Sequence, residues 1–338
     1  MENVRIGIIG CGYWGPNLIR NIHEITSSEL VAVADLNEDR LNAIKTRYHD
    51  VITTRNYRDL FDLNLDGILL ATPPSTHFAI ASDVLNHGIN VMVEKPMTTN
   101  TKDAEALIEL AAKKQLVLMV GHTFIYNNAL HELKKLMNND DIGRVHYIDT
   151  ARLSLGLYQP GLNVLWDLAP HDLSIIFFLL EKNPISIEIF GTACVLKGVQ
   201  DVVHLNIMYP GNVLAHIHVS WLAPVKVRRV TVVGSKKMVV YNDIEALDKL
   251  KIYDKGVEIP EYADSYTEWQ CSYRAGNIVI PNIKFTEPLR LECQHFLDCI
   301  ANKVPCMTSG EEGLKVVKML EVAQNILMNE HYGEVLEW

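Results

Sequence analysis

Two groups of ionisable residues have the types and the spacing needed for proton transfer. Lys95 lies in Glu94-Lys95-Pro96, and Asp167 precedes His171 by four residues, which places both on one face of a helix. A histidine can accept a proton from an alcohol near neutral pH, and a nearby carboxylate can orient it. A lysine can donate to the same oxygen and stabilise a developing alkoxide. The alternative interpretation is a solvated Lys95, a capping Asp167 and a structural His171.

A glycine turn near the start of the chain can hold a cofactor. The sequence G-C-G-Y-W-G, residues 10–15, follows the apolar run Val4–Ile9 and opens a segment of helical length. In this context the glycines predict a tight turn that receives the pyrophosphate of a dinucleotide at a helix N-terminus. The predicted cofactor contacts of the turn are Gly10, Gly12, Tyr13, Trp14 and Gly15. Tyr13 and Trp14 are expected where the cofactor borders the substrate.

An acidic residue after the second apolar run indicates which dinucleotide binds. Asp35 stands twenty residues after Gly15, and a carboxylate there accepts hydrogen bonds from the ribose hydroxyls and repels a 2′-phosphate. The nearest arginine is Arg40, on the next predicted helix, so no arginine is expected beside Asp35. We therefore predict NAD(H) in preference to NADP(H). The alternative is that the glycines only make a turn and Asp35 caps the following helix.

The elements that must position these residues change in character near Gly121. Before it, short apolar runs alternate with amphipathic segments, which predicts an α/β Rossmann domain over residues 1–121, with a doubly wound parallel sheet between two helical layers. The expected strands are Val4–Ile9, Leu30–Ala34, Gly67–Ala71, Asn90–Val93 and Val117–Val120. The expected helices are Pro16–Ile25, Glu38–Tyr48, Ser75–Asn86 and Thr101–Lys114, with Asn37 and Ser75 as N-caps. The segments 72–77 and 94–96 follow strands and should face the cofactor.

Residues 122–338 predict a second domain, of the α+β class, and the resemblance described below implies that it binds substrate and mediates oligomerisation. Its expected strands are Val145–Leu155, Ile185–Phe190, Val202–Met208, Val213–Trp221, Lys226–Val233 and Lys237–Tyr241. Short turns between them favour a large, mostly antiparallel open sheet. The expected helices are Ala129–Met137, about Asp167–Leu180, Pro288–Asn302 and Gly310–Asn329. Pro170 is expected in the first turn of its helix, and residues 256–283 are expected to be an irregular loop or crossover.

Composition excludes several classes of partner. The chain has 338 residues and a formal net charge of −10, which opposes general attraction to nucleic acid or to an anionic membrane.

We find no signal peptide pattern and no apolar stretch that approaches a transmembrane helix, so a cytoplasmic protein is expected. The six cysteines form no C-x-x-C pair, which predicts reduced thiols and no metal site.

The motifs, taken in order, resemble a known family. The glycine turn, A-T-P-P-S-T-H (71–77), E-K-P (94–96) and D-L-A-P-H-D (167–172) are similar to the glucose–fructose oxidoreductase/inositol dehydrogenase (Gfo/Idh/MocA) family over essentially the whole chain. The resemblance implies that Lys95 contacts substrate and nicotinamide, that His171 donates or accepts the proton, and that Asp167 accompanies it. Residues that match the family's cofactor-lining positions are Thr72, Pro73, His77 and Glu94. The family's C-terminal sheet usually mediates homodimers or homotetramers.

Finer features resemble one subgroup, the nucleotide-sugar 3-dehydrogenases and ketoreductases. These features are G-Y-W-G-P-N (12–17) and Y-R-A-G-N (273–277) with Pro281. Many family members carry a basic stretch after the residue equivalent to Gly121, whereas residues 122–128 here offer hydrogen-bonding groups and no arginine. The candidate substrate contacts are Tyr126, Asn127, Trp166 and Arg274. Arg274 is expected to meet a diphosphate or, alternatively, to form an ordinary structural ion pair.

Together these patterns predict an NAD-dependent enzyme that moves hydride between a sugar ring hydroxyl and the nicotinamide. The expected substrate is a nucleotide-activated hexose of the UDP-N-acetylglucosamine type, oxidised at C3. Three alternatives stay open: a glycosidase that uses NAD for transient C3 oxidation, a dehydrogenase of a free sugar or inositol, and a non-enzymatic NAD-binding regulator.

Overall fold

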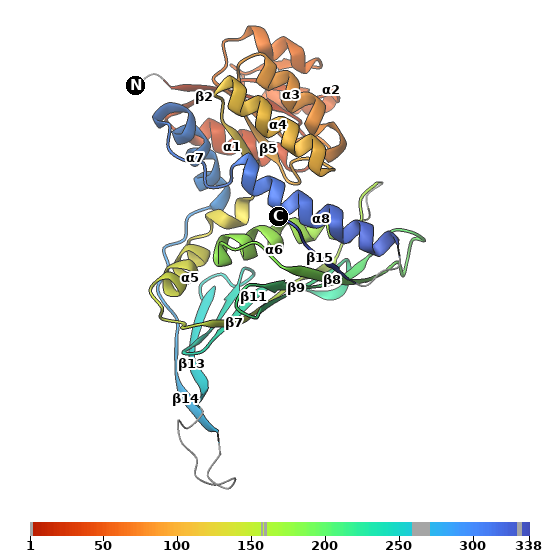
Figure 1. Ribbon diagram of the computed structural model, residues 1–338. Helices are drawn as coiled ribbons and strands as arrows, with labels where there is room; N and C mark the ends of the chain where they lie inside the picture. The colour runs from red at the N-terminus through yellow and green to blue at the C-terminus, as the bar shows by residue number, and fades with distance from the viewer. Residues whose placement is uncertain (1–2, 157, 159–160, 259–270, 330–332) are drawn as a thin grey trace. The chain divides into compact units, whose positions relative to one another are not determined.

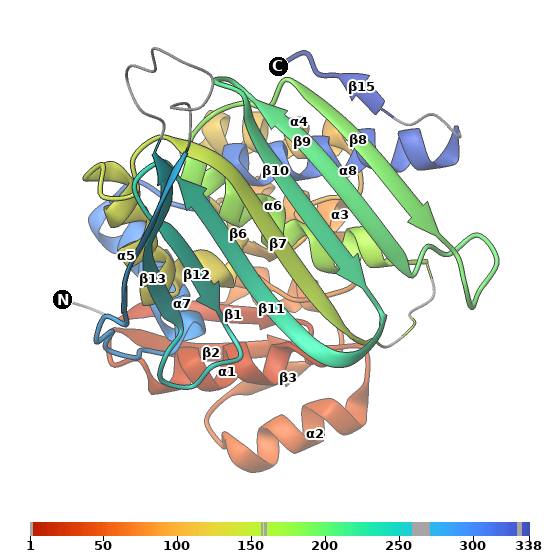
Figure 2. The ribbon, with the colours of Figure 1, turned by 90° about the horizontal axis from the view of Figure 1, so that it is seen from below.

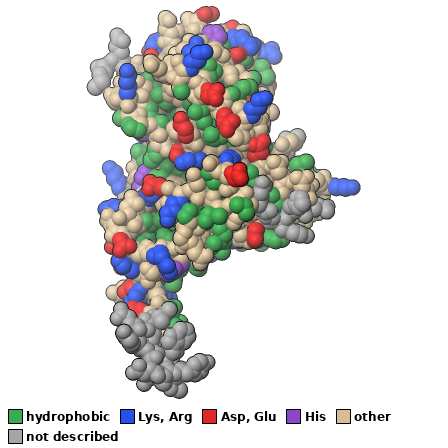
Figure 3. Space-filling model, in the orientation of Figure 1, with side chains coloured by type: hydrophobic (Ala, Val, Ile, Leu, Met, Phe, Trp, Pro, Cys, Tyr) green, Lys and Arg blue, Asp and Glu red, His purple; other side chains and the backbone are tan. Residues whose placement is uncertain are grey.

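The computed structural model describes residues 3–156, 158, 161–258, 271–329 and 333–338, and these form two compact units (Figure 1). Unit 1 comprises Met1–Tyr126 and Thr286–Glu321, and unit 2 comprises Asn127–Phe285 and Val322–Trp338. On the face shown in Figure 3, acidic and basic side chains are interspersed over the coloured part of the surface. No described helix combines the length and the apolar character needed to cross a bilayer.

The sheet of unit 1 is wholly parallel, as predicted. Its six strands lie in the order β3-β2-β1-β4-β5-β6. Their bounds are β1 Val4–Ile9, β2 Ser28–Ala34, β3 Ile52–Thr54, β4 Gly67–Leu70, β5 Asn90–Glu94 and β6 Leu118–Gly121. The sequence analysis missed β3, because a strand of three residues is too short to show a periodic pattern.

Helices cover both faces of this sheet. They are α1 (Gly15–Glu24), α2 (Glu38–Arg47), α3 (His77–Asn86) and α4 (Thr101–Lys114), with the 3₁₀ helices η1 (Tyr57–Asp62), η2 (Pro74–Thr76) and η3 (Thr123–Tyr126). Asn37 caps α2 as predicted, because its side chain accepts the Arg40 N–H at 3.1 Å. The prediction that Ser75 caps the third helix is wrong. The fixed φ of Pro74 starts a 3₁₀ turn that includes Ser75, and α3 begins only at His77.

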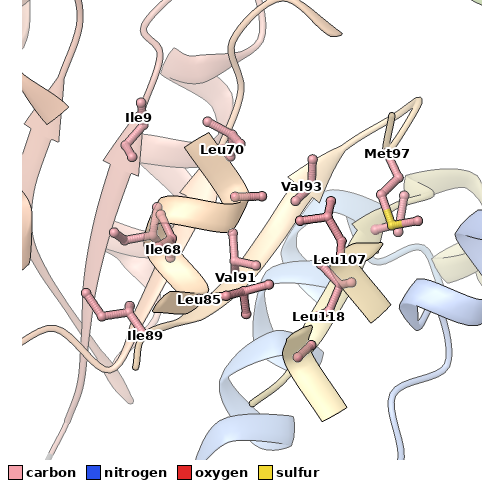
Figure 4. Close-up of a cluster of buried hydrophobic side chains, with 14 of the residues drawn as sticks. Ile9, Ile68, Leu70, Leu85, Ile89, Val91, Val93, Met97, Leu107 and Leu118 are labelled. Carbon is pink, nitrogen blue, oxygen red and sulfur yellow. The ribbon is translucent and has the colours of Figure 1, made fainter. Parts of the chain in front are cut away.

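One hydrophobic core joins the central strands to α3 and α4 (Figure 4). Leu70, Val91 and Val93 on the strands, and Leu85 and Leu107 on the helices, are all fully buried. Strands that are covered on both faces need apolar residues at every position, which explains the continuous apolar runs of the sequence. This core fixes the carboxyl ends of β4 and β5, where the candidate cofactor loops begin.

A segment distant in sequence completes unit 1. Helix α7 (Pro288–Asn302) packs against α1 and β1, and Arg20 bonds Glu287 at 2.5 Å. A Cβ on Gly67 would lie 2.8 Å from Ile300 and 3.0 Å from Phe296, so the glycine lets α7 approach the sheet closely. The sequence analysis assigns every residue after 121 to the second domain. The structure instead groups residues 286–321 with the first, because the apolar face of α7 fills this surface.

Unit 2 is built on a nine-stranded sheet, seen from below in Figure 2. Its order is β14-β13-β12-β11-β7-β10-β9-β8-β15. The bounds are β7 Val145–Leu155, β8 Ser186–Thr192, β9 Val202–Tyr209, β10 Val213–Ser220, β11 Leu222–Gly234, β12 Met238–Asn242, β13 Leu250–Glu258, β14 Ser272–Val279 and β15 Gly333–Val335. Only the β7–β10 pair is parallel among these described strands, which confirms the predicted, mostly antiparallel sheet.

Two predictions for unit 2 are wrong. The expected irregular stretch 256–283 contains β14, which pairs with β13, while residues 259–270 lie outside the described residues. Nearly every side chain of β14 is exposed, so the strand has no alternation of apolar residues to reveal it.

The second wrong prediction concerns the start of a helix. Unit 2 has two helices before its strands β8 to β14, α5 (Asn128–Asn138) and α6 (Val164–Leu180). Helix α6 begins three residues earlier than expected because Asn163 caps it, accepting the Trp166 N–H at 3.2 Å. Pro170 therefore lies inside the helix and not in its first turn. Because proline has no N–H, it cannot donate the usual helical bond to the Trp166 carbonyl.

Candidate active site

The glycine turn of unit 1 is shaped for close approach of a ligand to the backbone. Gly10 has a φ of +102°, and a Cβ there would collide with the Ala71 carbonyl. A Cβ on Gly15 would collide with the Gly10 carbonyl. At Gly12, by contrast, the nearest atom to such a Cβ is Arg40 Nη1, at 3.9 Å. Two glycines thus form the turn and the third leaves space above it, which fits the pyrophosphate of a dinucleotide.

Asp35 is held at the edge of this turn. Its carboxylate accepts the Cys11 N–H at 2.5 Å and the Asn37 N–H at 2.8 Å. The expectation that no arginine lies beside Asp35 is wrong, because Arg40 Nη1 lies 3.7 Å from Asp35 Oδ2. Arg40 stands in the first turn of α2, immediately after the loop that carries Asp35, so its side chain can fold back. The capping role itself belongs to Asn37 and not to Asp35.

The loops after β4 and β5 are tied together by one buried histidine. The ring nitrogens of His77 lie 2.8 Å from the Thr72 carbonyl oxygen and 2.9 Å from the Pro96 carbonyl oxygen. Thr72 and Thr76 also share a hydrogen bond of 2.7 Å between their hydroxyls. Pro73 adjoins this pair, just before η2. His77 therefore fixes the distance between the Thr72 loop and the loop that carries Lys95.

The two aromatic residues of the glycine turn have opposite environments. Tyr13 is 93 % exposed, whereas the indole nitrogen of Trp14 is buried and its side chain contacts the Glu94 carboxylate. Tyr13 is thus available to a ligand, and Trp14 joins the glycine turn to the end of β5.

Glu94 belongs to a buried polar group at the ends of β5 and β6. Its carboxylate packs against Gly121, where a Cβ would lie 2.9 Å from Oε2. Burial raises the pKa of Glu94 to about 7, although the positive charge of Lys95 opposes this shift. Burial and the same Lys95 charge lower the pKa of His122 to about 3. His122 is therefore neutral and Lys95 is the cation of this group.

A second buried carboxylate comes from α7. Glu292 accepts a hydrogen bond from the Thr123 hydroxyl at 2.7 Å, and its pKa is raised by burial and by the charge of Glu94. The sequence analysis included His122 only as part of the hydrogen-bonding stretch 122–128, and it missed Glu292. The place of His122 directly after β6 was a usable signal, because ligands bind at strand ends. No sequence signal pointed to Glu292, because only folding brings α7 to the ends of β5 and β6.

Unit 2 contributes an acid–base pair on α6. Asp167 and His171 lie one turn apart in this helix, as the spacing predicts, and both are half-buried. The indole N–H of the buried Trp221 donates to Asp167 Oδ2 at 3.0 Å. Trp221 therefore fixes the carboxylate that stands next to the candidate general base.

A buried ion pair anchors the same helix to the sheet. Arg152 on β7 lies 2.7 Å from Asp172, and their side chains are 6 % and 1 % exposed. Burial raises the pKa of Asp172, and the Arg152 charge opposes this shift. Because Asp172 follows His171 directly, the pair holds the backbone of the histidine in place. The sequence analysis missed Arg152, since its strand is distant from the motif.

Three of the four candidate substrate contacts already use their polar atoms within the fold. The Tyr126 hydroxyl lies 3.0 Å from Thr308 Oγ1, and Asn127 caps α5 and donates to the Tyr241 hydroxyl at 2.9 Å. Arg274 bonds Asp254 at 2.8 Å and Glu258 at 2.7 Å, which is the structural ion pair that the sequence analysis left open. Trp166 is half-buried on α6, directly before Asp167.

Comparison with known proteins finds family matches for both the N-terminal and the C-terminal part of the chain. Residues 4–122 match the model of the oxidoreductase family with an NAD-binding Rossmann fold (GFO_IDH_MocA), and residues 130–240 match the GFO/IDH/MocA C-terminal domain. An uncharacterized oxidoreductase of Escherichia coli is 30 % identical over 252 residues, covering 70 % of each chain. The myo-inositol 2-dehydrogenase of Thermotoga maritima is 24 % identical over 310 residues, covering 84 % of this chain and 90 % of that protein.

A third relative is similar over nearly its whole length. The UDP-N-acetylglucosamine 3-dehydrogenase of Acidithiobacillus ferrooxidans is 25 % identical over 327 residues, covering 94 % of this chain and 95 % of that protein. Its solved structure covers 97 % of this chain and 99 % of its own, with a TM-score of 0.81 at 22 % identity. The two-part fold is thus the same in both proteins.

Proposed function

Because this chain belongs to the GFO/IDH/MocA oxidoreductase family, with an NAD-binding Rossmann domain, we propose that it is an NAD-dependent sugar dehydrogenase. The proposed substrate is a nucleotide-activated hexose of the UDP-N-acetylglucosamine type, and the proposed site of oxidation is its C3 hydroxyl. One observation carries the proposal: α6 holds a half-buried histidine one turn after a carboxylate that Trp221 orients. A protein that only senses NAD needs no such acid–base pair.

The chain's own residues have distinct roles in this reaction. His171 accepts the proton of the substrate hydroxyl, and Asp167 orients the substrate and the histidine. Lys95 donates a hydrogen bond to the same oxygen and stabilises its developing negative charge. When bound, NAD would supply the two-electron acceptor for the hydride of the oxidised carbon. In the reverse direction His171 returns the proton to the ketone oxygen.

The cofactor roles follow from unit 1. The open space above Gly12 and the N-terminus of α1 receive the pyrophosphate. Asp35, at the edge of the turn, receives the ribose hydroxyls, and its negative charge supports our preference for NAD over NADP. Arg40 partly offsets that charge. Side-by-side measurement of the two Kd values should show tighter binding of NAD than of NADP.

The choice of substrate rests on the similarity to the Acidithiobacillus enzyme across both units. The experiment is to follow NAD reduction with UDP-N-acetylglucosamine, free N-acetylglucosamine and myo-inositol at equal concentrations. We expect the highest kcat/KM with the nucleotide sugar. Substrate carrying deuterium at C3 should pass the label to NADH, whereas substrate labelled at C4 should retain it.

Other outcomes would identify the alternatives. The similarity to myo-inositol 2-dehydrogenase favours a second candidate function, oxidation of a free inositol. Faster reduction of NAD with myo-inositol than with the nucleotide sugar would support this second candidate and contradict our proposal. Cleavage of a glycoside without accumulation of NADH would indicate a glycosidase. If the protein binds NAD but turns over no sugar, the result would favour the non-enzymatic NAD-binding regulator.

A further inference from the structure

Three side chains with donor atoms that suit zinc meet at the end of α7. His295 and Cys299 lie one turn apart on this helix, and Cys306 lies on the segment that follows it. One donor atom of each residue lies within 4.8 Å of the other two. We propose that His295, Cys299 and Cys306 form a zinc site with a fourth position left for water. The sequence analysis expects no metal site because the six cysteines form no C-x-x-C pair. Helix spacing and the return of the chain nevertheless bring a histidine and two cysteines together.

The geometry of the cluster matches a tetrahedral site. Cys299 Sγ lies 3.5 Å from His295 Nε2. In a tetrahedral zinc site with ordinary bond lengths, a sulfur and a nitrogen ligand are about 3.6 Å apart. The donor atom of Cys306 lies within 4.8 Å of a donor atom of each of the other two residues. Only small movements are then needed to place all three donor atoms around one ion.

The histidine has its lone pair on the correct nitrogen. The Met307 N–H donates to His295 Nε2 at 3.0 Å, so this nitrogen carries a lone pair and no proton. A neutral imidazole is the form that binds metal. Zinc would take this lone pair in place of the amide. Met307 is half-buried and follows the exposed residues 303–305, so the amide can turn to water.

The surrounding charges also favour a cation. The carboxylates of Asp298 and Glu311 lie near enough to act electrostatically on Cys299 and Cys306, respectively. Two thiolates balance the charge of Zn²⁺, which suits a site that is partly buried. No acidic ligand is required, and the half-buried Cys306 leaves one side open to solvent.

The site would connect α7 to the sheet of unit 1. Directly after Cys306 and Met307, the Thr308 carbonyl accepts the Val120 N–H at 2.8 Å, and Ser309 forms a bridge with Met119 of β6. The Tyr126 ring lies 5.7 Å from the His295 ring. A metal bound here would hold α7, the 303–309 segment and β6 in one arrangement, so we infer a stabilising role.

Cobalt is the probe for this proposal, because tetrahedral Co²⁺ with thiolate ligands absorbs visibly and replaces zinc in such sites. The full chain is stripped of metal with a chelator under a thiol-free reductant and titrated with Co²⁺. We expect thiolate-to-cobalt charge transfer and tetrahedral ligand-field bands that saturate at one equivalent, and Zn²⁺ should displace them. Zn²⁺ should also raise the midpoint of thermal unfolding.

The decisive variant is Cys306→Ser, because Cys306 is half-buried and its replacement is expected to fold. Loss of one ligand should weaken cobalt binding by on the order of 100-fold or more, since even supporting residues around a site contribute about 10- to 100-fold. Cys194→Ser, which changes an exposed thiol outside the cluster, is the matched control and should bind as the wild type does.

Two results would overturn the proposal. One is a wild-type protein without the charge-transfer band, and the other is undiminished binding by Cys306→Ser. A mass loss of two hydrogens in air, with no cobalt binding by the reduced chain, would show a disulfide-forming pair in place of a metal site. Circular dichroism of each variant separates loss of a ligand from loss of the fold.

Discussion

The two units use different parts of the chain for their chemistry. In unit 1 the candidate cofactor surface is made mainly of backbone: a glycine turn, the N-terminus of α1 and two loops that His77 holds together. In unit 2 the candidate chemistry lies in side chains of one helix, which Trp221 and Arg152 fix from the sheet. A backbone surface depends on a few local residues, whereas an oriented side chain depends on distant ones. Substitutions in the two units should therefore separate cofactor affinity from turnover.

The largest effect is expected from His171→Ala. Loss of a general base lowers kcat by about 10²- to 10⁴-fold, while the Kd for NAD, set by unit 1, should stay within about twofold. Lys95→Ala should lower kcat to a similar extent. Stopped-flow turnover measures kcat, and displacement of fluorescent NADH by NAD measures the Kd for NAD. Lys113→Ala, at an exposed lysine on α4, is the control, and near-full activity of His171→Ala would contradict the assignment.

Gly12→Ala should have the opposite pattern of effects: weaker NAD binding with little change in kcat. A methyl group fits at this position without contacts closer than 3.9 Å, so the fold should be retained, but it occupies the space above the turn. We expect the Kd for NAD to rise about 10-fold or more, equivalent to about 1.4 kcal/mol, with an unchanged melting temperature. Gly10→Ala provides the contrast, because its methyl group collides with the Ala71 carbonyl and should lower the melting temperature. Unchanged NAD affinity in Gly12→Ala would contradict the assignment of the pyrophosphate to the space above Gly12.

Trp221→Phe tests the long-range support of unit 2. The substitution keeps an aromatic ring in the core and removes the N–H that donates to Asp167. It also removes part of a fully buried indole, so a moderate fall in the melting temperature is expected in addition. A hydrogen bond to a charged group contributes about 1.5 kcal/mol or more, so kcat should fall about 10-fold, with an altered pH profile and an unchanged Kd for NAD. Trp338→Phe serves as the control. If Trp221→Phe lowers the melting temperature but leaves the kcat profile unaltered, Trp221 is structural and does not position Asp167.

The smallest expected effect concerns the buried Glu94. Burial raises its pKa from the ordinary 4.5 to about 7, so the folded chain holds this proton more tightly than the unfolded chain. The free energy of unfolding should therefore decrease as the pH rises from about 4.5 to about 7. Glu94→Gln should flatten this decrease in urea titrations, although Glu292 acts in the same direction. Glu109→Gln, on the exposed face of α4, should keep the wild-type slope.

The sequence predicts local features well and misses the contacts that distant residues make. The glycine turn, the strand ends and the spacing of Asp167 and His171 are local features, and their elements were located within a few residues. Arg152, Trp221 and Glu292 were missed because only tertiary contacts bring them to the motifs. Tyr126 and Asn127 come soon after β6, where ligand contacts are expected, but their polar groups are bonded to Thr308 and Tyr241. Sequence position alone does not reveal such partners.

The separation of unit 1 into two stretches has a consequence during protein synthesis. About 160 residues lie between Tyr126 and Thr286, so at typical elongation rates about 8 to 30 s pass before α7 is made. Until then Gly67 and the neighbouring apolar surface of the nascent Rossmann sheet have no α7 to cover them. The growing chain should therefore be a client of chaperones that bind exposed apolar segments, and ribosomes stalled before residue 286 should carry a domain that is more sensitive to protease than the finished protein.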